Sequence, residues 1–262
     1  MRKGVSDPLR IYGQAFLLFL YGPVLMMPLF SLNDSIFPAF PLAGFTLKHY
    51  RSLAHNPNMI DALMNSIALG LSIAVISTVF GLLAALAVTR FRMPGRTVAV
   101  GAIVLPLVVP SIIVGVALLV ILRRFLSVEL SLLTIGAGHL LLCVPFSMLV
   151  LMARLEGFDR SLEEASNDLG ETAWMTFWRV TFPLALPGIL ASLLMSFTVS
   201  FDEFVLAFFL SGTDTTLPVY IFSQLRFPQR LPSMLALGSV ILGATTIVIV
   251  SAELLRRRGV RP

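Results

Sequence analysis

Long apolar runs separated by short polar segments recur along the chain. Six of them are long enough to cross a bilayer, which takes about 20 helical residues at ~1.5 Å per residue. The predicted spans cover residues 11–32, 62–89, 97–122, 130–153, 184–212 and 231–252. The alternation of apolar and polar residues that marks a membrane β-barrel is absent from the sequence, so each span is predicted as an α-helix.

The charged residues predict how these spans are oriented. Six spans place both termini on one side, and thirteen of the nineteen Lys and Arg residues fall on that side. The positive-inside rule therefore predicts cytoplasmic termini. Arg2 and Lys3 precede the first apolar run, as in a signal peptide. That run is about 22 residues long and lacks a following A-x-A site, which favours an uncleaved first span.

Composition supports a membrane protein. Apolar residues make up 57% of the chain, charged residues 13%, and the mean hydropathy is +0.91. Soluble domains have about 45–50% apolar and about 25% charged residues. These values exclude a soluble globular, disordered or nucleic-acid-binding protein, and the basic excess is interpreted as topology. We predict one all-α, multi-pass domain over residues 1–262, in contact with membrane lipid.

Cysteine and histidine give no sign of a metal or redox site. Cys143 is the single cysteine, which excludes an internal disulfide, and it is interpreted as a small buried apolar residue. His49, His55 and His139 lack metal-ligand spacing. His139 lies alone in an apolar segment, where packing or an interhelical hydrogen bond is favoured over a ligand role. No metal, cofactor or catalytic residue is predicted for this chain.

One polar loop, residues 154–183, interrupts the spans on the predicted cytoplasmic side. Its pattern predicts two short helices. Ser161 and Glu164 fit a capping box, Gly170 suits a helix stop with positive φ, and Thr172 can cap the second helix. The loop contains six of the fourteen acidic residues: Glu156, Asp159, Glu163, Glu164, Asp168 and Glu171.

The faces of the two predicted helices leave two interpretations open. In the first helix, small residues at 165 and 166 would allow a close approach by another surface. Helical spacing in the second helix predicts a stripe of Trp174, Phe177, Trp178 and Thr181. The segment is either a docking site for a partner protein or an amphipathic helix lying at the lipid headgroups.

The segment Glu164-Ala165-Ser166-x₃-Gly170-x₉-Val180-x-Phe182-Pro183 resembles the EAA loop of ABC importer permeases, E-A-A-x₃-G-x₉-I-x-L-P. The spacing matches throughout. Ser166, Val180 and Phe182 depart from the pattern by small-for-small or apolar-for-apolar changes. The resemblance implies a six-span permease with the MetI-like fold.

In that family the EAA loop couples the permease to a separate ATPase. The resemblance implies that Glu164 pairs with or caps groups of the ATPase, that Ala165 allows close approach, and that Gly170 supplies the turn. The chain contains no G-x-x-x-x-G-K-[ST] segment, so ATP and Mg²⁺ would bind to the partner ATPase. The full set of candidate coupling residues is Glu163, Glu164, Ala165, Ser166, Asp168, Leu169, Gly170, Trp174 and Pro183.

Other segments resemble the spermidine/putrescine-type permeases: residues 62–66, 105–110, 200–205, 208–212 and 215–218. This implies a bacterial inner-membrane permease for a polyamine. An opine, 2-aminoethylphosphonate or an amino-acid derivative stays open as the substrate. The implied partners are a second permease, expected to be a different chain, two copies of the ATPase and an extracytoplasmic solute-binding protein.

Candidate residues for the translocation path lie inside the spans. Asp202 and Glu203 would lie within the fifth span, and burying an acid there costs about 2.5–3.5 kcal/mol, so each needs a cavity or a partner. A cation path and a structural pair with Arg or backbone both stay open. Pro106 and Pro110 interrupt the third span, as path-lining breaks or as packing kinks.

The outer segments 33–61 and 213–232 are either a receiving surface for the binding protein or an ordinary cap. Two other classes of protein compete with an importer permease: a secondary transporter or channel, and a membrane-embedded enzyme. A secondary transporter usually shows paired repeats with broken helices in both halves, whereas the polar loop here has no counterpart. A membrane-embedded enzyme would need a catalytic arrangement, and the predicted spans contain none.

Overall fold

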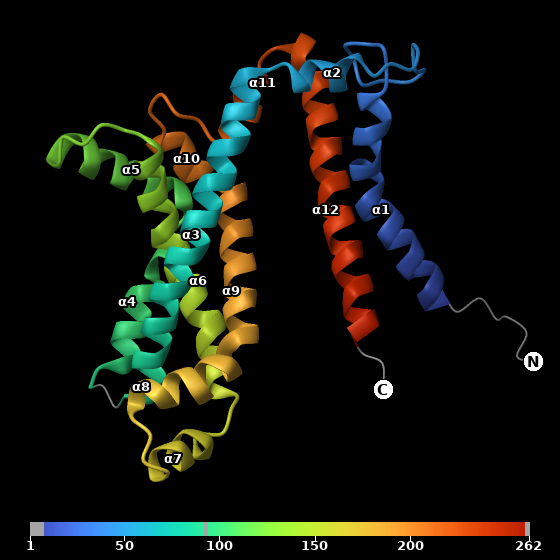
Figure 1. The fold of residues 1–262 in the computed structure, drawn as a ribbon. Coiled ribbons are helices and arrows are strands. Elements are labelled where there is room, and N and C mark those ends of the chain that lie inside the picture. The colour runs from blue at the N-terminus through green and yellow to red at the C-terminus, as the bar shows by residue number, and fades with distance from the viewer. Residues whose placement is uncertain (1–7, 92–93, 260–262) are drawn as a thin grey trace, which may run out of the picture. The chain divides into compact units, whose positions relative to one another are not determined.

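The computed structural model describes residues 8–91 and 94–259, which form helices joined by short loops (Figure 1). The described residues fall into two compact units, residues 8–60 with 221–259 and residues within 61–220. In chain order the elements are α1 (Pro8–Ser31), α2 (Lys48–Ala54), α3 (Pro57–Arg90), α4 (Arg96–Val108), α5 (Ser111–Val120), η1 (Ile121–Phe125), α6 (Leu132–Glu156), α7 (Ser161–Asp168), α8 (Ala173–Thr176), η2 (Phe177–Thr181), α9 (Phe182–Asp202), α10 (Val205–Leu210), α11 (Leu217–Gln224), η3 (Pro228–Arg230) and α12 (Leu231–Gly259).

The helices confirm the prediction of an all-α, multi-pass membrane protein. Among the described residues, five helices are long and apolar enough to cross a membrane, and a sixth span results if α4 and α5 are counted as one broken span. The cytoplasmic location of the termini stays a prediction, as does the single domain over residues 1–262. Four of the basic residues used for the orientation, Arg2, Lys3, Arg92 and Arg261, lie outside the described residues.

In the first unit, α1 and α12 pack side by side, and α2 packs against α12. Hydroxyl groups join them: Ser31 Oγ lies 2.6 Å from Tyr50 Oη and 3.5 Å from Ser239 Oγ. The segment after α1 is held by Asn33, whose Oδ1 accepts a 2.9 Å hydrogen bond from the Ala43 amide. This unit therefore has its own polar framework at the α1–α2 end.

In the second unit, α6 packs against α9, and small polar side chains lie in the contact. Buried Ser196 on α9 bonds Ser147 on α6 at 2.8 Å, and Ser200, one turn further, bonds His139 Nδ1 at 2.8 Å. The interhelical hydrogen bond expected for His139 is therefore confirmed. Cys143, between them on α6, is fully buried as expected.

The predicted third span is not one straight helix. α4 ends at Val108, and α5 runs at 97° to it after the break at Val109 and Pro110. Pro110 has no amide hydrogen to continue the ladder of α4, and Val109 before it is extended, with ψ of 131°. Pro106 lies inside α4 without ending it.

The predicted fifth span also ends earlier than expected. α9 stops at Asp202 instead of continuing to residue 212, because Glu203 adopts an extended conformation with ψ of 102°. The short helix α10 then begins at Val205 and packs against α5 and α6. The acidic pair is therefore at a helix break and not inside a continuous helix.

Candidate functional site

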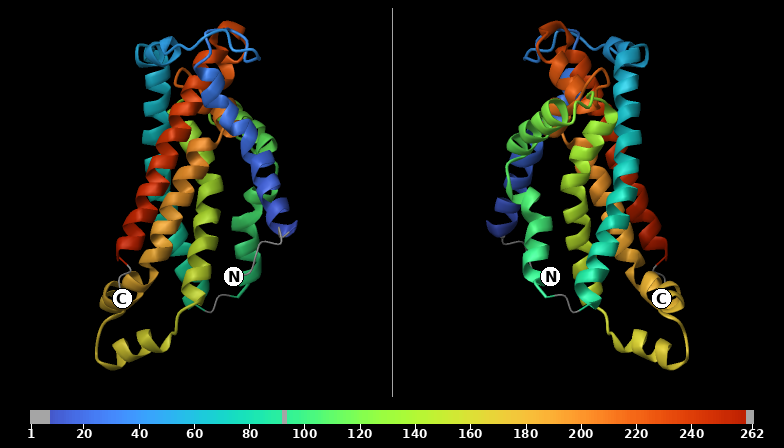
Figure 2. Two further views of the ribbon diagram at one scale, coloured as in Figure 1. Left: turned by 90° about the vertical axis from the view of Figure 1, so that its right-hand side faces the viewer. Right: turned by 90° about the vertical axis from the view of Figure 1, so that its left-hand side faces the viewer.

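The EAA-like segment forms α7 and α8 in the second unit, between α6 and α9. Figure 2 shows α7, in yellow, projecting beyond the ends of α6 and α9. This is the same end of the unit at which α3 ends and α4 begins (Figure 1). The segment is thus a helix–turn–helix that stands out from the bundle.

The turn between α7 and α8 has the predicted conformation. Gly170 has a φ of +88°. Its amide donates to the Asn167 carbonyl at 2.9 Å, and the Glu171 amide donates to the Ser166 carbonyl at 3.2 Å. These two bonds form a Schellman motif, which satisfies the last carbonyls of α7. Thr172 caps α8, as predicted, by accepting from the Met175 amide.

The start of α7 differs from the predicted capping box. The helix begins at Ser161 itself, and Asp159 Oδ1 accepts the Ser161 amide at 3.0 Å. Hydrogen bonds from Ser161 hold the pKa of the exposed Asp159 carboxyl below its usual value. Ser161 lies inside the helix, the N-cap position is held by Arg160, and no side chain caps the helix there, so the predicted Ser161–Glu164 capping box is wrong.

Most candidate coupling residues present an open surface. The side chain of Leu169 is 86% exposed and that of Trp174 is 67% exposed. The exposed members also include Glu164, Ala165, Asp168, Gly170 and Pro183. Ser166 is half-buried, and its hydroxyl bonds Thr176 Oγ1 at 3.0 Å, which ties α7 to α8.

The predicted aromatic stripe forms a cluster around η2. The rings of Trp174 and Phe177 lie 6.3 Å apart, those of Phe177 and Trp178 5.2 Å apart, and Trp178 contacts Phe182 at 4.9 Å. Thr181, at the end of the same stripe, is buried. The ring contacts therefore join α8, η2 and the start of α9.

Glu163 points inward, unlike its neighbour Glu164. Its Oε2 lies 2.9 Å from Arg90 Nε at the end of α3, and its Oε1 accepts a 2.6 Å hydrogen bond from Thr181. Arg160 donates to the carbonyl of Thr89. Sequence reasoning used Arg90 and Arg160 only for topology. The signal in the sequence that could have indicated this contact is Glu163, because a carboxylate beside an apolar face needs a cationic partner.

The two acids proposed for the path have different environments. Glu203 Oε1 accepts hydrogen bonds from the amides of Val205 at 3.0 Å and Leu206 at 3.1 Å, so it caps α10. This is the structural pairing with backbone that was one of the two expectations. Asp202 is exposed, and its carboxylate has no hydrogen bond or ion pair within the described part of the chain.

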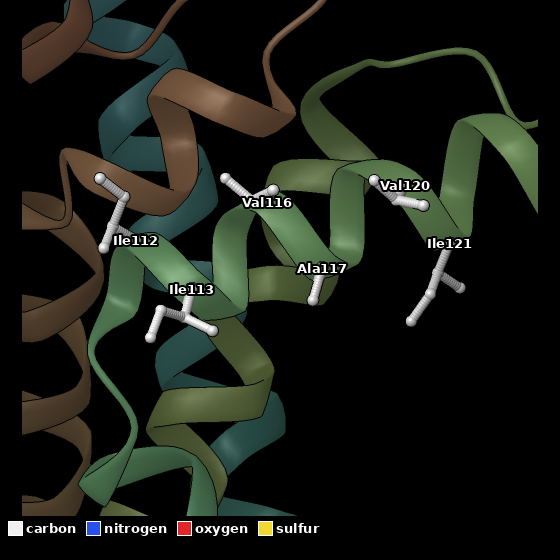
Figure 3. A pocket seen from close by; sticks show the side chains of 6 residues that line it. All are labelled: Ile112, Ile113, Val116, Ala117, Val120 and Ile121. Atoms are coloured by element: carbon white, nitrogen blue, oxygen red, sulfur yellow. The ribbon is translucent and has the colours of Figure 1, made fainter.

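The α5 helix, after the Pro110 break, presents an apolar hollow. The residues that line it are aliphatic and lie along one side of α5 and the start of η1 (Figure 3): Ile112, Ile113, Val116, Ala117, Val120 and Ile121. Such a lining offers no group that would hold a cation, and it suits lipid chains or an apolar partner surface. Within the described residues, no group of three or more His, Cys, Asp or Glu is placed to bind a metal.

Comparison with known proteins agrees with a multi-pass transport subunit. The chain is 35% identical over 237 residues to the putrescine transport system permease protein PotI of Escherichia coli K12, covering 88% of this chain and 84% of PotI. It is 30% identical over 240 residues to the spermidine/putrescine transport system permease protein PotC of the same organism, covering 91% and 90%.

Solved structures share the fold. A bacterial ABC transporter that imports the acidic polysaccharide alginate matches with a TM-score of 0.74 and 18% identity, over 97% of this chain and 94% of that chain. The MetNI methionine ABC transporter matches with a TM-score of 0.57 and 17% identity, over 79% and 100%. The predicted MetI-like ABC permease fold is confirmed.

The class is therefore that of ABC importer permeases, inner-membrane subunits that are not enzymes and that work with a separate ATPase. The chain belongs to the family of binding-protein-dependent transport system inner membrane components, whose pattern matches residues 77–260. Permeases of this class function with a second permease and a solute-binding protein.

Proposed function

We propose that α7 and the turn after it are the surface on which the ATPase acts. The observation that carries this is the combination of a Schellman turn at Gly170 with an exposed row of small and apolar side chains on α7. Ala165 leaves the backbone of α7 open to close approach, and the Glu164 carboxylate is exposed beside it. Leu169 supplies apolar area that a partner would remove from water.

The proposed substrate is a polyamine. Support comes from the names of the two relatives, a putrescine and a spermidine/putrescine permease, which match over most of this chain. An opine, 2-aminoethylphosphonate or an amino-acid derivative would be carried by the same machinery, and competition for uptake separates these substrates from a polyamine.

The proposed path uses the exposed acid at the end of α9. The Asp202 carboxylate is free to attract a cationic substrate, whereas the oxygen of Glu203 that caps α10 is already engaged. Pro106 and Pro110 complete the proposed path residues, and the break at Pro110 gives α4 and α5 separate directions. A second permease, two ATPase copies and a binding protein complete the proposed importer.

The test is purification of the tagged chain with its ATPase from membranes. Ala165→Trp fills the exposed face of α7 and is expected to release the ATPase while the chain remains in the membrane. Thr198→Ala, an exposed position on α9 away from α7, serves as the control. The proposal fails if Ala165→Trp copurifies as much ATPase as the unchanged chain does.

A further inference from the structure

Two arginines join the end of α3 to the start of α7. α3 ends at Arg90, whose Nε lies 2.9 Å from Glu163 Oε2 on α7. From the opposite direction, Arg160, just before α7, donates to the carbonyl of Thr89 in the last turn of α3. Carbonyls at a helix end lack partners inside the helix, so this bond satisfies one of them.

The Arg90–Glu163 pair is partly withdrawn from water. The two side chains are 14% and 17% exposed, compared with 47% and 53% for Arg96 and Glu156, the ion pair between α4 and α6. Exposed pairs contribute little, whereas breaking a buried pair leaves an uncompensated charge. The Arg90 guanidinium also lies 4.7 Å above the Phe158 ring.

Glu163 extends this contact to a second membrane helix. Its other carboxylate oxygen accepts the Thr181 hydroxyl, immediately before α9. One side chain of α7 therefore holds the end of α3 and the start of α9 at once. Without Arg90, Glu163 would keep its bond to Thr181, but among the contacts described above α7 would reach α3 through the Arg160 bond alone.

We propose that Arg90 is a positioning residue through which displacement of α7 is transmitted to the membrane-spanning helix α3. This rests on the proposed function, because α7 must be the element that the ATPase moves. Arg90 itself would touch neither substrate nor ATP. Its guanidinium keeps α7 and the last turn of α3 together, so that the two move as one body.

The experiment uses the whole importer reconstituted in vesicles and measures uptake of labelled putrescine per ATP hydrolysed. In Arg90→Ala the ATPase is expected to copurify at the normal level, and the uptake per ATP is expected to fall at least about fivefold, the low end of typical coupling between sites. Arg90→Lys should recover part of the loss, since an ammonium group can pair with Glu163 but not form the same planar stack on Phe158.

Arg96→Ala is the matched control. It removes one arginine from the same predicted side of the membrane and breaks the exposed pair with Glu156, so any effect on topology is shared. Its uptake per ATP should equal that of the unchanged chain. If Arg90→Ala does not accumulate, Glu163→Gln tests the same link, since its amide oxygen can still accept the Thr181 hydroxyl.

Three outcomes would overturn the inference: a normal uptake per ATP in Arg90→Ala, an equal loss in Arg96→Ala, or loss of the ATPase from the Arg90→Ala complex. Failure of the proposed function gives a different result, because Ala165→Trp would then leave the ATPase bound. A released ATPase in Ala165→Trp together with a normal ratio in Arg90→Ala would reject the role of Arg90 alone.

Discussion

Replacing Gly170 perturbs only the backbone of the turn between α7 and α8. Its φ is +88°, and a Cβ placed there meets no atom within 4 Å among the described residues. A substitution therefore introduces no clash with a neighbour. The cost comes from holding an L-residue in the left-handed region, about 1–2 kcal/mol for most residues, more for a β-branched one and less for asparagine.

A cost of this size changes the population of the native turn about 5- to 30-fold. Because α7 and α8 are short and joined by this turn, we expect the loss to appear as local opening of the loop and not as unfolding of the bundle. The expected order of ATPase copurification is glycine, then Gly170→Asn slightly lower, Gly170→Ala lower still, and Gly170→Val reduced by about tenfold or more.

Gly95 provides the matched control. It precedes α4, has a φ of +77°, and also leaves open space around its Cβ among the described residues. Gly95→Ala therefore carries similar backbone strain outside α7 and its turn, and ATPase copurification should be unchanged. The reasoning is refuted if Gly170→Asn loses as much ATPase as Gly170→Val, or if Gly95→Ala loses as much as Gly170→Ala.

Three further predictions follow from single contacts. Glu203→Gln keeps an oxygen to cap α10 and should retain most putrescine uptake. Glu203→Ala should lose the cap, worth about 1.5–3 kcal/mol for a charged acceptor, and should lose uptake with it. An equal loss of uptake in the two variants would instead indicate that the charge itself is needed. Gly81→Ala would place a Cβ 2.5 Å from that of Ser147 and should cost about 1–3 kcal/mol of stability, measured as a lower melting temperature in detergent. Gly101→Ala, with open space among the described residues, should leave the melting temperature unchanged. An unchanged melting temperature for Gly81→Ala would contradict the packing of α3 on α6. Thr172→Ala removes the cap of α8, worth about 1 kcal/mol, and should speed hydrogen exchange of the Met175 amide, which donates to the Thr172 hydroxyl. Unchanged exchange of that amide would contradict the role of Thr172 as a cap.

The sequence was most informative where structure depends on neighbouring residues. The stop at Gly170 and the cap at Thr172 are each set by two to five consecutive residues, and both formed as predicted. The start of α7 was misplaced because Asp159 and Ser161 are both good amide acceptors, and sequence alone does not rank them. The angle between α4 and α5 depends on what packs against α5, chiefly α10, and not on Pro110 alone.

Contacts between distant segments lay beyond sequence reasoning. Arg90 and Glu163 are far apart in the chain, and the Lys and Arg residues near spans serve as topology signals whether or not they form pairs. Asp202 and Glu203 looked alike because both occur in an apolar run. The extended conformation of Glu203 separates them, leaving one carboxylate on the surface and the other on the amides of α10.

Uptake of labelled putrescine and spermidine tests the central claim most directly. It is measured in cells that lack this gene and every other polyamine uptake system, after restoring either the intact gene or its Gly170→Val variant. The account predicts that the intact gene restores uptake, that the variant does not, and that unlabelled opines or 2-aminoethylphosphonate fail to compete. Uptake that stays absent with the intact gene and its partner subunits present would contradict a polyamine importer coupled through α7.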